Sequence, residues 1–160
     1  MPIRASSSSF GPAATQGPGE DTVKSYLLAA ALQDLAAVRF FLEQVNLHPD
    51  ASYAGKPTAL CYAVLKPHIG LLDYLLGRGA GVAHRDGLSM TPLHYAALGG
   101  CHCCLARLIA AGAPLNALNR SGLTPLALTL DKPQLAGSRA LLESHGATLT
   151  AGPPRPKRFH

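Results

Sequence analysis

The residues with the most reactive side chains form one run, Cys101-His102-Cys103-Cys104. Thiolates and imidazoles are zinc ligands, but a structural zinc site takes four ligands, usually from two separated pairs. The sequence offers no second Cys/His pair. At the start of a helix, Cys101 and Cys104 share one face while His102 and Cys103 point elsewhere. This arrangement disfavours a metal site.

Two interpretations of these thiols stay open. In the simpler one, Cys104 packs as a small apolar residue, and Cys101 and Cys103 lie nearer the surface. In the other, a thiol at the helix N-terminus is sensitive to oxidation, because the helix dipole favours its thiolate form. Rapid, selective alkylation of Cys101 or Cys103 would distinguish the second from the first.

His94 is the other residue that invites a catalytic role, but nothing in the sequence supplies it with a partner. No Ser, Cys or carboxylate stands at a spacing typical of a catalytic triad. The sequence also contains no P-loop, dinucleotide fingerprint, His-Glu-x-x-His or Gly-x-Ser-x-Gly motif. We therefore expect neither catalysis nor a bound cofactor.

A repeat with a period of 33 residues must position these side chains. Thr91-Pro92-Leu93-His94 recurs as Thr124-Pro125-Leu126-Ala127 and, less cleanly, as Thr58-Ala59-Leu60-Cys61, so that the threonines are 33 residues apart. The units close on Gly79-Ala80, Gly112-Ala113 and, one residue late, Gly146-Ala147. A fixed period of this length indicates one supersecondary unit stacked along an axis.

Each unit is predicted to be a pair of helices. In the third unit, Thr91 is the expected N-cap and Pro92 the first helical residue, where its missing N–H costs nothing. Gly99-Gly100 ends the first helix, and Gly112 supplies the left-handed residue that ends the second. In the first unit, apolar residues at spacings of three and four break near Gln33-Asp34. Asp-Gly and Ser-Gly pairs between units predict hairpin-like turns.

These motifs resemble the ankyrin repeat. The third unit, including Asp86 and His94, is a close match, whereas the second has Cys61 and Pro67 where histidine and glycine are usual, and the fourth has Ala127. The resemblance implies an all-α solenoid of four repeats at about 20–52, 53–85, 86–118 and 119–148. We expect residues 1–19 and 149–160 to be disordered tails. In this family, the histidine after Thr-Pro-Leu bridges neighbouring turns.

The fourth unit departs furthest from the pattern. Its first helix, expected at 126–130, lacks the polar outer face of a terminal cap, and Pro133 and Gly137 weaken the segment after it. We expect this unit to fray, or to dock onto a partner, a second copy or further residues of a longer isoform.

Composition favours one folded domain. Apolar residues are 48% and charged residues 14% of 160, and the net charge is +5. Four of the fourteen basic residues lie in the two tails, which contain no acid, so the rest has ten basic and nine acidic residues. A nucleic-acid reader would carry its charge on the folded surface, so nucleic acid is disfavoured.

Location is inferred from missing signals. No apolar run reaches about 18 residues, and no secretory signal precedes the repeats, so we expect no membrane span and a cytoplasmic or nuclear protein. Reduced cysteines follow from that location. Residues 153–158, Pro-Pro-Arg-Pro-Lys-Arg, fit an SH3 ligand or a weak nuclear-entry cluster. For so short a motif, a disordered tail that only aids solubility is the favoured interpretation.

The resemblance implies a protein-binding surface on the concave side of the stack, formed by turn tips and first helices. Aromatic residues, methionine and flanking cations there are typical of binding hot spots. Alignment gives these contact residues: Tyr53, Lys56, Tyr62, Lys66, Arg85, Leu88, Met90, Tyr95, Leu98, Arg120, Leu123 and Lys132, with Leu65 and Leu128 beside them. For Leu88, Leu123 and Leu128, packing against neighbouring turns is an equal alternative.

The predicted function is therefore non-catalytic protein recognition by a monomer, as adaptor, scaffold or inhibitor. Direct inhibition of a kinase is an alternative, by analogy with four-repeat inhibitors of cyclin-dependent kinases, and rests on size alone. A Cys-based redox or metal sensor is the alternative from another class. The family resemblance also marks Asn116 as a position at which hydroxylation is sometimes found.

Overall fold

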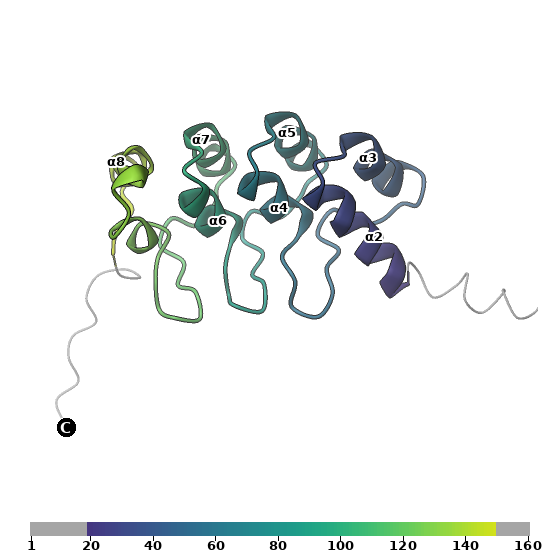
Figure 1. Cartoon of the computed structure of the whole chain (residues 1–160), viewed down its shortest axis with the longest axis horizontal. Helices are drawn as coiled ribbons and strands as arrows, with labels where there is room; N and C mark the ends of the chain where they lie inside the picture. The colour runs from purple at the N-terminus through teal and green to yellow at the C-terminus, as the bar shows by residue number, and fades with distance from the viewer. Residues whose placement is uncertain (1–18, 150–160) are drawn as a thin grey trace, which may run out of the picture.

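The computed structural model describes residues 19–149, and within that range the chain is all α-helical, as the sequence predicted (Figure 1). The α-helices are α2 (Glu20–Ala31), α3 (Leu35–Glu43), α4 (Ala59–Leu65), α5 (Ile69–Gly77), α6 (Pro92–Gly99), α7 (His102–Ala110) and α8 (Ala136–Ser144). Two short 3-10 helices, η1 (Ala127–Thr129) and η2 (Pro133–Leu135), precede α8. The predicted tails lie almost wholly outside the described residues.

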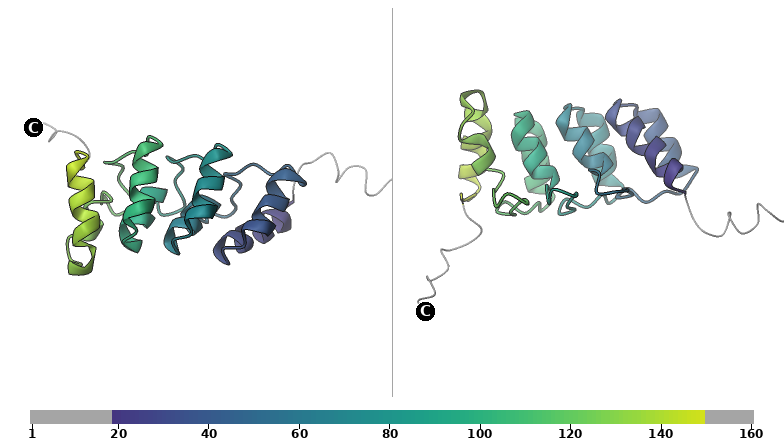
Figure 2. Two further views of the ribbon diagram at one scale, coloured as in Figure 1. Left: turned by 90° about the horizontal axis from the view of Figure 1, so that it is seen from above. Right: turned by 60° about the horizontal axis from the view of Figure 1, so that its bottom comes forward.

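The helices form two rows, which are seen side by side in Figures 1 and 2. The inner row is α2, α4, α6 and η1, and the outer row is α3, α5, α7 and α8. Each inner helix packs on the next inner one, and α7 packs on both α5 and α8. Long loops project from the inner row between successive pairs. The predicted linear stack of helix pairs is therefore confirmed.

The third repeat shows why the helices begin and end where they do. Thr91 has extended backbone angles and caps α6, whose first residue is Pro92. Gly100 ends α6 with a φ of 69°, and Gly112 follows α7 with a φ of 88°. Both φ values lie in the left-handed region that glycine enters without a steric penalty. The helix boundaries are thus set by the residues that the sequence marked.

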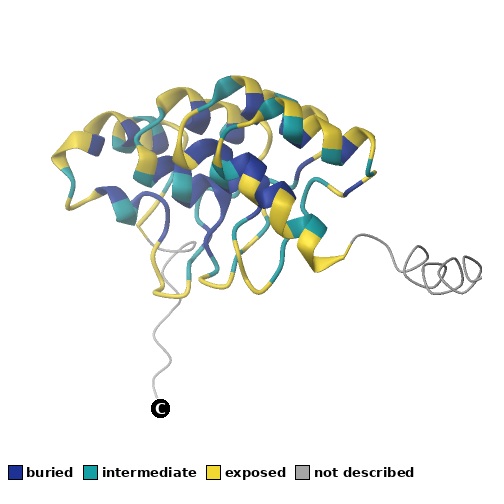
Figure 3. Ribbon diagram, turned by 45° about the vertical axis from the view of Figure 1, so that its right-hand side comes forward, coloured by how far each residue is buried: buried dark blue, intermediate teal, exposed yellow. Residues whose placement is uncertain are grey.

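One continuous core runs through the repeats. Leu60 and Leu93 are fully buried and Leu126 is 3% exposed, and all three belong to the same apolar cluster. Burying each of these side chains contributes roughly 1.5–3 kcal/mol. Figure 3 shows the buried positions concentrated along the inner row, where the helices meet. Because the core is shared between repeats, each repeat depends on its neighbours for stability.

The first repeat has the predicted break between its helices. Gln33 takes a φ of 62°, and the carboxylate of Asp34 accepts a hydrogen bond from the Ala37 N–H at 3.0 Å, which starts α3. Not every leucine of the apolar pattern is buried, however, since Leu28 is 59% and Leu32 is 69% exposed. Within the described chain, α2 has an inner-row neighbour on one side only, so part of its apolar surface stays open.

The α-helix expected at 126–130, the first of the fourth repeat, was wrong. Residues 127–129 form only a 3-10 turn. Pro133 has no N–H to donate to the Thr129 carbonyl, so an α-helix cannot continue there. The Thr129 hydroxyl donates to the Leu126 carbonyl at 2.7 Å, and Arg139 Nη2 donates to the Thr129 carbonyl at 2.6 Å. The same two carbonyls also accept backbone N–H groups three residues later, Leu126 from Thr129 at 3.0 Å and Thr129 from Lys132 at 3.3 Å, so the side-chain bonds add to the 3-10 pattern.

Candidate functional site

Three hairpin-like loops, called hairpins 1 (48–58), 2 (81–91) and 3 (114–124), form one edge of the stack (Figure 1). Adjacent hairpins are joined by backbone hydrogen bonds. The Gly87 N–H donates to the Gly55 carbonyl at 2.7 Å, and the Arg120 N–H donates to the Leu88 carbonyl at 2.8 Å. A Cβ atom at Gly87 would stand 3.1 Å from the Gly55 oxygen, so a larger residue would push the two hairpins slightly apart. The hairpins therefore hold a fixed spacing.

Each of hairpins 2 and 3 is also braced internally by an Asx turn. The Asp86 carboxylate accepts from the Leu88 and Met90 N–H groups, both at 2.9 Å. The Asn119 side-chain oxygen does the same one repeat later, accepting from the N–H groups of Ser121 and Leu123 at 2.9 and 3.0 Å. Such local bonds fix the turn without help from the rest of the fold.

His94 joins α6 to hairpin 3, as the family resemblance implied. Its Nδ1 accepts from the Thr91 N–H at 3.1 Å, so the proton of the neutral ring is on Nε2, which lies 3.0 Å from the Leu123 carbonyl oxygen. The ring is fully buried, and burial lowers its pKa. This geometry describes a structural histidine with no free nitrogen for catalysis.

The second repeat replaces this histidine with Cys61. Its Sγ lies 3.6 Å from the Thr58 hydroxyl, so the contact within the helix N-terminus is retained but the link to the next hairpin is lost. Burial raises the pKa of the Cys61 thiol to about 12. Such a thiol is unreactive at neutral pH.

A groove lies where hairpin 1 meets the first two inner helices. It has a volume of about 220 Å³. Three of its residues were predicted as partner contacts, namely Tyr53, Lys56 and Tyr62; the others come from α2, namely Lys24, Leu27, Leu28 and Ala31. Tyr53 and Tyr62 are half-buried, and Lys56 is exposed. The structure thus brings together part of the predicted site and extends it onto α2.

The sequence analysis did not predict the α2 part of the groove. It used the apolar residues of the first unit, which include Leu27 and Leu28, only to predict a helix. The signal was present, because Lys24, Leu28 and Ala31 are spaced by four and three residues and so share one helix face. Lys24 also places its Nζ 5.4 Å from the centre of the Tyr53 ring and 2.8 Å from the Glu20 carboxylate. These contacts hold the lysine at the rim of the groove.

The exposed basic side chains on the two sides of the stack differ in whether they have a partner. Among the residues that the structure describes, the predicted contacts Lys56, Lys66 and Arg120 are exposed and their side chains have no ion-pair or hydrogen-bond partner. On the outer row, Arg39 pairs with Glu43 at 3.3 Å and Arg107 pairs with Asp73. The side formed by the hairpins and α2, α4 and α6, called the concave face below, therefore carries the cations that are free to meet a partner.

The remaining predicted contacts are spread along the concave face rather than gathered in the groove. Leu88 is 59% and Leu123 is 38% exposed, whereas Leu98 is half-buried. Arg85 is exposed but donates from Nη1 to the Leu118 carbonyl of hairpin 3 at 3.2 Å. Lys132 is half-buried between η1 and η2.

The assignment of Met90 to the contact surface is wrong. This residue is 7% exposed, and the Asn119 amide donates to its sulfur at 3.4 Å, so hairpin 3 covers it. Tyr95 is also less available than expected, because its hydroxyl donates to the Asp86 carboxylate. Desolvation and this hydrogen bond raise the pKa of Tyr95. Both residues brace the hairpins.

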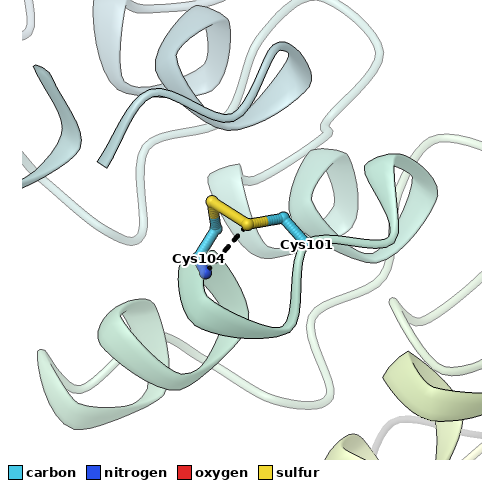
Figure 4. The surroundings of a disulfide bond; sticks show 2 residues. All are labelled: Cys101 and Cys104. Carbon is cyan, nitrogen blue, oxygen red and sulfur yellow. Dashed lines mark hydrogen bonds between the residues drawn. A yellow bond between two sulfur atoms is a disulfide. The ribbon is translucent and has the colours of Figure 1, made fainter. Parts of the chain in front are cut away.

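The expectation of reduced thiols is also wrong for two of the four cysteines. A disulfide joins Cys101 and Cys104, whose Cα atoms are 5.2 Å apart, at the start of α7 (Figure 4). This separation lies within the usual disulfide range, because residues i and i+3 share one helix face. Cys104 is buried, Cys101 is half-buried and Cys103 is an exposed free thiol, which matches the exposures expected in the simpler of the two interpretations.

Residues 19–149 contain neither a candidate metal site nor a candidate membrane-spanning helix. No group of three or more His, Cys, Asp or Glu side chains in this range could hold a metal ion. None of the described helices has the length and apolar character needed to cross a membrane.

Asn116 is half-buried, and its side-chain oxygen accepts from the Thr148 N–H at 2.7 Å.

Comparison with known proteins agrees with the observed repeats. A family model described as ankyrin repeats in three copies matches residues 60–152, which is more than half of the chain. The chain is also similar to a putative ankyrin repeat protein of Fowlpox virus (strain NVSL), with 46% identity over 48 residues. That alignment covers 30% of this chain and 34% of the viral protein, so the chain spans about a third of that relative's length.

Proposed function

Because the chain belongs to the ankyrin-repeat family, whose repeats are general protein–protein interaction modules, we propose that it binds a protein partner on its concave face. The observation that carries the proposal is the groove between α2, hairpin 1 and α4, which is lined by two tyrosines, two leucines and the lysines Lys24 and Lys56. We propose that the role is that of an adaptor, scaffold or inhibitor without catalysis, in the cytoplasm or the nucleus.

The chemistry of the groove supports a particular kind of partner segment. Tyr53, Tyr62 and Leu28 offer a partly exposed apolar surface that a partner's aliphatic or aromatic side chain can cover. Lys56 and, further along, Lys66 are exposed cations that form no ion pair in the described chain. A segment that carries one large apolar residue with acidic residues beside it is complementary to both features.

The rigidity of the hairpins supports affinity. The backbone bonds from Gly87 to Gly55 and from Arg120 to Leu88 hold the loops in place before a partner arrives. Ordering a flexible loop on binding costs free energy, and a loop that is already ordered avoids that cost. The same rigidity predicts little change in the hairpins between the free and bound states.

Affinity capture from cell extracts with matched variants tests the proposal. The concave variant combines Lys56→Glu with Tyr62→Ala and changes both charge and apolar surface in the groove. The control is Phe40→Ala, which removes an aromatic side chain that is 55% exposed on the outer-row helix α3. We expect partners that bind the wild type and the control but not the concave variant. Equal retention by all three proteins would contradict the proposal.

A further inference from the structure

The disulfide at the start of α7 includes Cys101, the residue that caps the N-terminus of this helix. The same position caps the outer helix in the first two repeats. In each of the three repeats, the residue before the outer helix accepts a hydrogen bond from the backbone N–H three residues later. Asp34 accepts from Ala37 at 3.0 Å, His68 from Leu71 at 3.0 Å, and Cys101 Sγ from Cys104 at 3.2 Å. Only in the third repeat is the capping atom a sulfur, and only there is the third residue a cysteine.

The fold does not need this disulfide. Helices α3 and α5 begin at the same place in their repeats without one, through the capping hydrogen bond alone. A cross-link that closes so short a loop also restricts the unfolded chain less than one that closes a long loop, so it contributes less stability than most disulfides do. Cys104 has a packing role in either state, because it is fully buried and corresponds to the buried Leu71 of α5. The dithiol and the disulfide are both compatible with the stack.

The reduced form has a built-in nucleophile. A Cys101 thiolate would accept the same N–H of Cys104 and would lie at the positive end of the α7 dipole, which stabilises an anion. Cys101 is half-buried and Cys104 is fully buried, so a small molecule from solvent reaches Cys101 first. The sulfur of Cys104 is close enough to complete the reaction, as the disulfide shows (Figure 4).

We propose that Cys101 and Cys104 are a reversible dithiol–disulfide site that exchanges electrons with a small thiol–disulfide couple of the glutathione type. In oxidation, the Cys101 thiolate attacks the small disulfide, forms a mixed disulfide and releases one small thiolate. Cys104 then loses its proton and attacks the Cys101 sulfur, which releases the second small thiolate. The site gives up two electrons and two protons, and the small disulfide becomes two thiols. Reduction is the reverse sequence and again begins at Cys101.

The neighbouring Cys103 is not a member of the pair. It is an exposed free thiol one residue before Cys104, and it offers an internal reference for ordinary thiol reactivity. The buried Cys61 offers the opposite reference, because it is inaccessible. The imidazole of His102 lies against Gly137 of α8, so the site is located at the junction of the third and fourth repeats.

The test incubates the full chain in buffers with graded ratios of reduced to oxidised glutathione, followed by acid quenching, thiol alkylation and mass spectrometry of peptides. We expect the Cys101–Cys104 pair to convert fully between dithiol and disulfide across the series, in the wild type and in Cys103→Ser. The Cys104→Ala variant keeps a small buried side chain and should trap glutathione on Cys101. The Cys101→Ser variant keeps a capping oxygen and should leave Cys104 unmodified.

Three results would overturn the proposal. One is a Cys101–Cys104 pair that stays reduced in the most oxidising buffer or oxidised in the most reducing one. Another is loss of exchange in Cys103→Ser, which would assign the chemistry to the exposed thiol. A third is a Cys104→Ala variant that is folded by circular dichroism but takes up no glutathione at Cys101.

Discussion

The Nε2 atom of His94 lies 3.0 Å from the carbonyl oxygen of Leu123, 29 residues later in the sequence. The bond joins an inner helix of the third repeat to the hairpin that begins the fourth. Because Nδ1 accepts from the Thr91 N–H at the same time, a single neutral ring ties the start of α6 to hairpin 3. The ring has no exposed surface, so water cannot replace either bond.

Replacing His94 with alanine should destabilise the fold markedly. The change leaves a cavity and removes the acceptor of the buried Thr91 N–H, and we expect a loss of about 2–4 kcal/mol in the free energy of unfolding. Urea unfolding followed by circular dichroism measures it. The control is His145→Ala at an exposed position after α8, for which we expect a loss below about 0.5 kcal/mol. Similar losses for both variants would contradict the structural role of His94.

Stability should fall with acid because of the same residue. Burial lowers the pKa of His94 in the folded state, so the unfolded chain, with a histidine pKa of about 6.5, takes up the proton more readily. The contribution of His94 is therefore complete above about pH 6.5 and is lost as the pH falls through the folded-state pKa. Unfolding free energies measured from about pH 8 down to about pH 5 should fall more steeply for wild type than for His94→Gln. Parallel curves would assign the acid sensitivity to other groups.

Binding through the concave face should be sensitive to salt. Lys56, Lys66 and Arg120 are exposed and unpaired among the described residues, so an acidic partner gains from all three. We expect the affinity for a captured partner to fall as salt rises, and the dependence to flatten when all three are changed to alanine. Isothermal titration calorimetry measures both. Arg39→Ala on the outer row is the control, and it should leave the salt dependence unchanged.

The fourth repeat should be the least protected part of the stack. Its inner element is the 3-10 turn η1, and Leu130 and Leu149 are 44% and 50% exposed at this end. Hydrogen exchange of a dilute monomer should therefore be faster in residues 126–146 than in residues 92–110. Equal protection of the two segments would show that the repeat is a complete cap. Slower exchange at higher protein concentration would instead indicate docking of a second copy.

The fold could be predicted because its determinants are local. The caps at Thr91 and Gly112 and the period of 33 residues are visible in the sequence, and the structure confirms the helices that they mark. The prediction of an α-helix at 126–130 was wrong. Pro133 was expected to weaken only the segment after this helix, but it also has no N–H to donate to the carbonyl four residues earlier, at Thr129.

The candidate site was harder to predict, because exposure depends on the next repeat. Alignment could place Met90 on a hairpin but could not show that Asn119 covers it. The groove needed the distance between α2 and hairpin 1, which no single repeat contains. The disulfide was missed for another reason: Cys101 and Cys104 were expected to share a helix face, but the thiols were assumed to be reduced.

Site-specific photocross-linking tests the central claim most directly. A photoreactive phenylalanine analogue replaces Tyr62 in the groove or Phe40 on the outer row, and each protein is irradiated in cell extract. Binding on the concave face predicts a discrete cross-linked protein from position 62, suppressed by Lys56→Glu, and none from position 40. Cross-links from position 40 with none from position 62 would contradict it.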